Sequence, residues 1–254
     1  MEENGSKYPV VMGLDVSTET IGVTIMVDDG SEYGKIAEMT HISPKAPKGI
    51  KGIESLFIKK KHFQSFISEF SKYRIDKVVI EEPLLSSNNK NTVATLLRFN
   101  GLISECIYNT FNVVPEYISS YDARKYSFPE LMAVRKYGKK EGSVYDRKKV
   151  VKANKEANFV LFGSYPWAID KKCVIQEKVS KLFPNIEWRY NKKGELRKEN
   201  FDATDSYVTC LGFINKEKYG EIEMKVDNIV ETEDKIEYDV LYWGKSVHRV
   251  TYFK

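Results

Sequence analysis

Four acidic residues in three separate stretches of the chain have types and positions suited to metal-dependent chemistry. Asp15 ends the apolar run VVMGLD, Glu81 ends the run VVIE, and Asp202 and Asp205 stand three residues apart in FDATDSY. A buried carboxylate is unfavourable unless it is paired or bound to a metal ion, so an acid at the end of a core strand needs an explanation. Four convergent carboxylates can hold two divalent cations roughly 3.5 to 4 Å apart, the clamp that phosphodiester hydrolysis needs.

Each of these acids also has an ordinary structural explanation. Asp15 could cap the turn that follows it, and Asp202 and Asp205 could open a helix, where negative charge is favourable. Glu81 and Glu82 could simply end a strand that emerges into solvent. Because adjacent strand residues point to opposite faces, only one of these two glutamates is expected to share a site with Asp15, and we favour Glu81. The combination of the three motifs is far more specific than any one of them.

The histidines and cysteines argue against a site built from nitrogen or sulfur ligands. The three histidines are scattered, and Cys106, Cys173 and Cys210 form no C-x-x-C pair, which excludes the pattern of a zinc ribbon or a disulfide framework. Any metal site must therefore consist of carboxylates. Oxygen ligands suit hard cations, so we expect Mg²⁺, two ions per site, with Mn²⁺ as a substitute.

The first half of the chain has the pattern of an α/β fold. Residues 8–16 and 21–27 are predicted to form a hairpin, with a third antiparallel strand over 35–42. Apolar residues at helical spacing then predict a helix that leads into the strand KVVIEEP, and a second amphipathic helix leads into a strand over 113–118. A strand, helix, strand order implies a parallel pair with a right-handed crossover, so the predicted sheet is mixed.

The second half is less regular. Residues 126–200 are basic and aromatic and are broken by prolines and glycines, so we expect helices joined by long loops there. A compact helix is expected from Asp202 or Ala203 to about Lys216. The tail, 221–254, alternates like a β-meander. We therefore predict a main domain over 1–220, with a basic insertion around 126–200, and a β-rich extension over 221–254.

Charge is divided unevenly along a chain of ordinary composition. The 254 residues are 42% hydrophobic and 30% charged, which is typical of a folded globular protein. Residues 121–200 hold 20 Lys and Arg against 10 Asp and Glu, whereas the rest of the chain holds 20 against 26. A polyanion-binding segment beside a carboxylate site would produce this division, although a solvated lysine-rich surface would too. No stretch has the apolar length of a signal sequence or a membrane span, so we expect a cytoplasmic protein.

Taken together, the motifs resemble those of the RNase H-like nuclease superfamily, and most closely the RuvC-type Holliday-junction resolvases. GLDVSTETIGVTIM resembles the first hairpin of that family, including a glycine seven residues after the acid. IEEPLLSSNNKN resembles its second motif, DATDSY its last motif, and KKCVIQEKVSKLFP its preceding basic helix. The resemblance covers about 150 residues in four blocks, which occur in the family's order.

The resemblance implies a fold, a site and a substrate. The fold would be an RNase H-like mixed sheet flanked by helices, over 1–220, and Asp15, Glu81, Asp202 and Asp205 would be catalytic metal ligands. Lys171 or Lys172 would lie near the scissile phosphate, and we favour Lys172 as catalytic. The protein would be a homodimer that makes paired incisions in branched DNA, a four-way junction, in the cytoplasm of a bacterial or phage-infected cell.

Predicted DNA contacts come from the basic residues, which would neutralise phosphates without reading sequence. These residues are Arg147, Lys148, Lys149, Lys171, Lys172 and Lys178. Leu84 stands three residues after Glu81, where the bacterial enzymes tend to carry an aromatic wedge, and a leucine wedge is also physically feasible.

Three other functions are compatible with parts of this pattern. A sugar kinase or actin-like ATPase also opens with G-[IL]-D-x-[GS]-T, but we find neither a second phosphate loop nor a glycine-rich adenosine motif. A catalytically silent RNase H-like factor that binds nucleic acid would gain nothing from four acids facing phosphate. A nuclease acting on flaps, replication forks or RNA-containing substrates would share the same chemistry.

Overall fold

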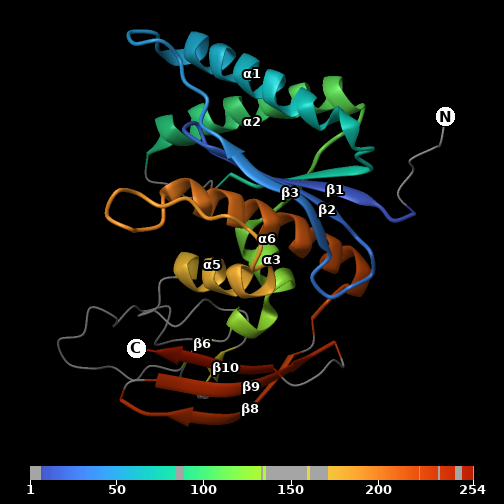
Figure 1. Ribbon diagram of the computed structural model, residues 1–254, viewed down its shortest axis with the longest axis vertical. Coiled ribbons are helices and arrows are strands. Elements are labelled where there is room, and N and C mark those ends of the chain that lie inside the picture. The colour runs from blue at the N-terminus through green and yellow to red at the C-terminus, as the bar shows by residue number, and fades with distance from the viewer. Residues whose placement is uncertain are drawn as a thin grey trace.

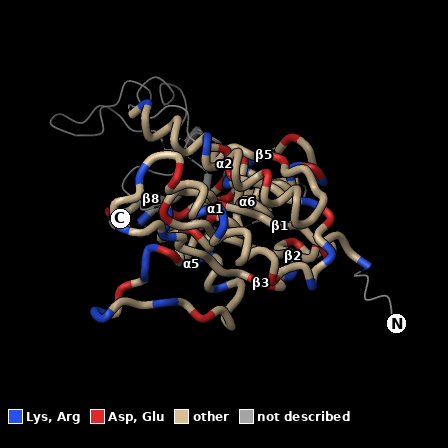
Figure 2. The backbone as a smooth tube through the Cα atoms, turned by 90° about the horizontal axis from the view of Figure 1, so that it is seen from above, with Lys and Arg blue, Asp and Glu red and all other residues tan. Residues whose placement is uncertain are grey.

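The computed structural model describes residues 7–83, 89–132, 134–135, 159–160, 171–222, 224–233, 235–243 and 248–253. These residues form stacked layers (Figure 1). Two helices lie on one side of a central five-stranded sheet, three further helices lie on the other side, and a three-stranded sheet lies beyond those helices. In the tube view of Figure 2, acidic and basic positions are scattered over the outside of the described chain.

The central sheet is mixed and has the strand order β3-β2-β1-β4-β5. The first three strands pair antiparallel and the last two pair parallel, as the sequence predicted. The strands are β1 (Val10–Val16), β2 (Ile21–Val27), β3 (Lys35–Ile42), β4 (Lys77–Glu81) and β5 (Glu116–Ile118). The ends of β1 and β4 that carry the acids lie side by side, because Leu14 pairs with Ile80 in parallel register.

One face of this sheet is covered by α1 (Gly52–Ser68), which continues into the 3-10 turn η1 (Glu69–Lys72), and by α2 (Lys90–Phe111). The contact is apolar: every second residue of β1, from Val10 to Val16, packs in the same cluster as α1 and α2. The side chain of Asn89 caps α2, and Asn112 ends it in the left-handed conformation.

The opposite face is covered by α6 (Lys198–Tyr219), which packs directly on β1 and β2. Behind α6 lie α3 (Ser120–Ser127), the 3-10 turn η2 (Pro129–Met132) and α5 (Lys171–Leu182). From Asn200 to Asn215 every residue of α6 except Phe201 is buried, so this helix is an internal layer of the fold rather than a surface helix.

The predicted C-terminal meander is confirmed. Its strands are β8 (Met224–Glu231), β9 (Lys235–Tyr242) and β10 (His248–Phe253), in the order β10-β9-β8. Tyr238, Val240 and Tyr242 of the middle strand join the hydrophobic cluster of α3, α5 and α6, and the Tyr238 hydroxyl donates to the carbonyl of Glu130. The tail therefore packs on the α6 side of the molecule. The division into units 1–220 and 221–254 stays a prediction.

A short antiparallel strand pair, β6 (Val134–Arg135) and β7 (Phe159–Val160), lies in the basic region around 126–200.

Among the described residues, no helix combines the length and the apolar character needed to cross a membrane.

Candidate active site

Asp15 lies on the α6 face of the sheet. Val11, with the same parity in β1, packs in the α6 cluster, and a side chain at Gly13 would meet Ser206 and Cys210 of α6. The alternative role for Asp15, capping the following turn, is not supported. Ser17 makes that turn: its hydroxyl donates to the carbonyl of Thr20 over 2.8 Å and accepts from the Thr20 amide over 3.0 Å.

Glu81 lies on the same face as Asp15, whereas Glu82 does not belong to that face. Val79, two residues before Glu81, packs in the α6 cluster, while Val78 and Ile80 pack toward α1 and α2. Glu82 lies beyond the end of β4 and is exposed. Geometry therefore favours Glu81 as the partner of Asp15, as the sequence suggested.

Two glycines let the backbone of α6 come unusually close to the strands. A Cβ atom at Gly22 would overlap the carbonyl of Asp202, and one at Gly13 would overlap the carbonyl of Ser206. Gly22 is the register partner of Asp15, so its missing side chain opens space directly beside that acid. A buried hydrogen bond of 2.8 Å between the hydroxyls of Thr24 and Ser206 fixes the helix in this position.

Asp202 and Asp205 are both buried on this close-packed helix, at 8% and 4% exposure. The prediction that they open the helix is wrong, because α6 begins at Lys198, a full turn before Asp202. Glu199 is the acid of the first turn. Capping and the helix dipole act mainly within that first turn, so they do not account for Asp205.

The four acids form one electrostatic cluster. Burial raises the pKa of Asp15 well above its ordinary value, and the negative charges of Glu81, Asp205 and Asp202 raise it further, against the opposing charge of Lys172. Burial is also the main reason why the pKa of Asp202 is raised, and Lys172 opposes that shift. The Oδ2 atom of Asp202 is buried and accepts no hydrogen bond from any described residue.

Two cations balance part of this charge, and both reach Asp205. The Nζ atom of Lys172 lies 3.1 Å from Asp205 Oδ2, and the Nη2 atom of Arg124 lies 3.8 Å from Asp205 Oδ1. Burial alone would lower the pKa of Lys172, but attraction to Asp205, Asp15 and Asp202 outweighs it and raises the pKa. The ammonium group of Lys172 is therefore held in its charged form against the acidic cluster.

The fold beneath this cluster matches those of solved Holliday-junction resolvases. RuvC from T. thermophilus in complex with a Holliday junction substrate superposes with a TM-score of 0.51 at 9% identity, covering 84% of this chain and 97% of that one. Ydc2, the yeast mitochondrial Holliday junction resolvase, gives a TM-score of 0.51 at 9% identity, with coverage of 85% and 82%. No protein-family model and no curated protein sequence matches the chain.

The chain has the RNase H-like fold of the RuvC-type resolvases. The predicted fold class and the predicted resemblance are both confirmed at this level. At 9% identity, this similarity concerns the arrangement of the helices and strands. The geometry of the site comes from the side chains of this RuvC-like fold described above.

The structure brings none of the other predicted DNA-contacting residues that it describes into the acidic cluster, and it leaves several of them undescribed. Lys178 points away from the acids, because its Nζ atom lies 3.1 Å from the buried carboxylate of Glu130 and close to the rings of Tyr33 and Phe128. Lys171 begins α5, and its side chain is outside the described part. Four others lie outside the described residues altogether: Leu84, Arg147, Lys148 and Lys149.

Arg124 is the residue that sequence reasoning missed. It comes from α3, which packs so closely on α6 that a Cβ atom at Gly212 would overlap the backbone of Ala123. Its side chain is 12% exposed, and its Nε atom is buried without a hydrogen-bond partner among the described residues. The only sequence signal was a basic residue next to a small one in a short helix, which is too common to be informative.

Proposed function

We propose that this protein is a metal-dependent endonuclease that cuts branched DNA, with the four-way junction as its substrate. The observation that carries the proposal is that the negative charges of Glu81, Asp202 and Asp205, from distant stretches of the chain, all act on Asp15 at the α6 face of the sheet. The RuvC-like fold supports the same conclusion, because the T. thermophilus protein of that fold was solved with a Holliday junction.

The residues present fit a pair of divalent cations. Three carboxylates raise the pKa of a fourth, and one buried oxygen of Asp202 has no hydrogen-bond partner among the described residues, so the cluster has an excess of negative charge and free ligand capacity. We assign Asp15, Glu81, Asp202 and Asp205 as ligands of Mg²⁺, with Mn²⁺ as a substitute. When bound, the two ions would supply Lewis-acid stabilisation of the attacking and leaving oxygens.

Binding these ions requires the acidic side chains to turn toward one another. Within the described ranges, no three Asp, Glu, His or Cys side chains are already grouped closely enough to hold a metal ion. Asp205 is held instead by Lys172 and Arg124. We infer that these two cations hold the Asp205 side chain in a fixed orientation, and that Lys172, which is 45% exposed, also reaches the scissile phosphate.

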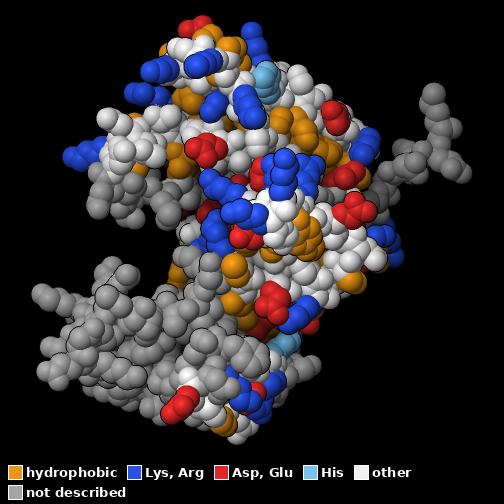
Figure 3. Space-filling model, turned by 60° about the vertical axis from the view of Figure 1, so that its left-hand side comes forward, with side chains coloured by type: hydrophobic (Ala, Val, Ile, Leu, Met, Phe, Trp, Pro, Cys, Tyr) orange, Lys and Arg blue, Asp and Glu red, His pale blue; other side chains and the backbone are white. Residues whose placement is uncertain are grey.

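A basic surface over α1 and α2, on the other side of the sheet from α6, can bind the phosphate backbone. Lysine and arginine side chains gather on the upper part of the face in Figure 3, over α1 and α2. The exposed and partly exposed lysines of α1 include Lys59, Lys60 and Lys61. Together with the predicted contacts of Lys148, Lys149, Lys171 and Lys172, they would make binding strongly dependent on salt. Paired incisions across a junction would require two copies, so we propose a homodimer.

One assay tests the proposed function against its alternatives. Purified protein is incubated with labelled four-way junction, flap and linear duplex, in Mg²⁺ and in EDTA. We expect symmetrical nicks confined to the junction and only in Mg²⁺. Preferential cutting of flaps or of RNA-containing strands would show that the four-way junction is not the substrate. If no nucleic acid is cut, the protein would be a nucleic-acid-binding factor and not a nuclease.

A further inference from the structure

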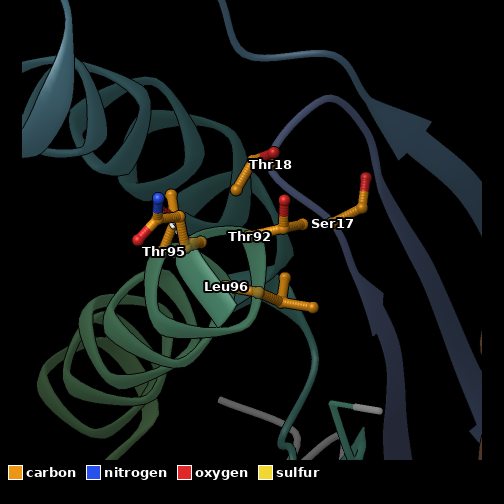
Figure 4. Close-up of a pocket in the computed structure, with 6 residues that line it drawn as sticks. Ser17, Thr18, Thr92, Thr95 and Leu96 are labelled. Atoms are coloured by element: carbon orange, nitrogen blue, oxygen red, sulfur yellow. Dashed lines mark hydrogen bonds between the residues drawn. The ribbon is translucent and has the colours of Figure 1, made fainter. Parts of the chain in front are cut away.

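A cavity of about 360 Å³ opens between the β1–β2 turn and the first two turns of α2 (Figure 4). Ser17 and Thr18 line it from the turn, and four side chains line it from the helix: Asn91, Thr92, Thr95 and Leu96. Figure 4 shows the side chains of Thr18 and Thr92 extending into the space between the two elements.

The chemistry of this lining suits an anion that carries several oxygen atoms. Five of the six side chains have a hydroxyl or carboxamide group, and none is acidic. The hydroxyls of Thr18 and Thr92 have no hydrogen-bond partner among the described residues, so both can donate to a ligand. The Thr95 hydroxyl is different, because it donates to the carbonyl of Asn91 over 2.8 Å. Hydroxyl and carboxamide donors in a lining that contains no carboxylate can donate hydrogen bonds to the oxygen atoms of a phosphate group.

The turn that forms one wall is fixed and lies next to a positive charge. Lys59 of α1 donates from Nζ to the carbonyl of Thr18 over 2.6 Å, and no described acidic residue forms an ion pair with it. Ser17 holds the same turn through its bonds to Thr20. The amides at the start of α2 are already bonded to the side chain of Asn89, so the cavity depends on side-chain donors rather than on the helix end.

The cavity is a near neighbour of the carboxylate cluster. Ser17 follows Asp15 by two residues, so their Cα atoms are at most about 7 Å apart. We propose that this cavity binds a backbone phosphate of the nucleic-acid strand that crosses the cluster, next to the phosphate that is cut. This subsite rests on the proposed function for its substrate, but its phosphate binding does not depend on cleavage.

Matched variants compare the loss of the two threonine hydroxyls that have no hydrogen-bond partner in the described part of the chain with the loss of one that is already bonded. Thr18→Val and Thr92→Val keep the shape of the side chain and remove a free donor, whereas Thr95→Val removes a hydroxyl that is already bonded to the helix backbone. Binding of a labelled four-way junction to the intact protein is measured in EDTA by fluorescence anisotropy. The Thr18→Val/Thr92→Val double variant should raise Kd about tenfold, the effect of losing hydrogen bonds to a charged group. Thr95→Val should leave Kd unchanged, and Thr92→Ser should retain wild-type affinity.

Lys59 is tested through the salt dependence of binding. Lys59→Gln should reduce the slope of log K against log salt by about one, because one phosphate contact is lost. Lys225→Gln, at an exposed lysine of β8 that pairs with Asp227 outside the proposed DNA surface, serves as the control for the change in net charge. Equal slopes for the two variants would contradict the placement of Lys59 beside a bound phosphate.

A direct measurement distinguishes failure of the subsite from failure of the proposed function. Methyl NMR signals of Thr18 and Thr92 are followed while a short oligothymidylate, and separately inorganic phosphate, is added in EDTA. We expect both signals to shift with the oligonucleotide. Shifts without cleavage of any DNA would leave the subsite standing and remove the nuclease. Junction cleavage with unshifted signals and an unchanged Kd for the double variant would overturn the subsite alone, as would a shift with inorganic phosphate only.

Discussion

The two faces of the five-stranded sheet are built from different kinds of residue. On the α1 and α2 face, large apolar side chains such as Leu14 and Ile80 are fully buried against others such as Phe63 and Ile103. On the α6 face, the strands present glycine to the helix, and buried hydroxyl groups bond across the contact.

This difference shows how one sheet can serve stability on one side and chemistry on the other. Burial of apolar side chains is the main favourable contribution to folding, and the α1 and α2 face maximises it. On the α6 face, Gly13 and Gly22 have no side chain to bury. The backbone of α6 can therefore come into contact with the strands. That approach brings Asp202 and Asp205 to the strand ends that carry Asp15 and Glu81.

The largest expected effect compares two adjacent glutamates on opposite sides of this division. Glu81→Gln should lower the rate of junction cleavage about 1000-fold, since divalent ions supply several kcal/mol of stabilisation to the transition state. Glu82→Gln removes an equal charge from an exposed position and should stay within about twofold of wild type. Rates are measured with labelled junction at saturating Mg²⁺. Equal losses of cleavage rate in the two variants would contradict the assignment of Glu81, on the α6 face, as the metal ligand.

The second test restores a side chain at the close contact. Gly22→Val should destabilise the fold by about 3 kcal/mol, because its Cβ atom would overlap the carbonyl of Asp202. Gly101→Ala is the matched control on α2, where a Cβ atom would meet nothing within 4 Å, and it should raise stability by up to about 1 kcal/mol. Urea denaturation gives both values. A tolerated valine at position 22 would mean that α6 does not need the close approach.

On the apolar face, a small core change should affect stability and leave catalysis alone. Ile103→Val removes one buried methyl group and should cost about 1 kcal/mol of stability. The cleavage rate at a temperature well below the midpoint should be unchanged. A large loss of activity with a normal unfolding curve would show that the two faces are coupled more strongly than their packing indicates.

The smallest effect is a pH dependence of stability in EDTA. The pKa of Asp15 is raised in the folded protein, so the stability from its bound proton is complete below the ordinary value of 3.8 and is lost as pH rises through the raised value. The free energy of unfolding should therefore fall over that window, and Asp15→Asn should make the curve flatter. A slope in Asp15→Asn identical to that of the wild-type protein would contradict the burial of Asp15 beside the other acids.

Most of the fold could be predicted from the local spacing of apolar residues. Alternating and helical periodicity predicted the hairpin, the parallel pair and the C-terminal meander, because each element buries one face and therefore repeats its apolar residues. The acids at the ends of β1 and β4 were readable for the same reason: a charge that ends an apolar run stands out. Strand alternation predicted only that one of Glu81 and Glu82 would share a site with Asp15, and the register of β4 with β1 supports the choice of Glu81.

Other features depend on tertiary contacts and left no local signal. The start of α6 was misplaced because its N-cap, Arg197, makes no side-chain cap, whereas Asp202 is a favoured capping residue. Arg124 reaches Asp205 only because α3 packs closely on α6 at Gly212. Lys178 belongs to a basic helix, but its partner Glu130 comes from a distant 3-10 turn, so nothing in the sequence predicted a buried ion pair.

Crystals of the protein soaked in MnCl₂ would test the central claim most directly, through anomalous scattering at the manganese edge. We expect two anomalous peaks bounded by Asp15, Glu81, Asp202 and Asp205, and the loss of both peaks in crystals of Asp15→Asn. Manganese bound only elsewhere, with these four carboxylates still apart, would contradict the central claim.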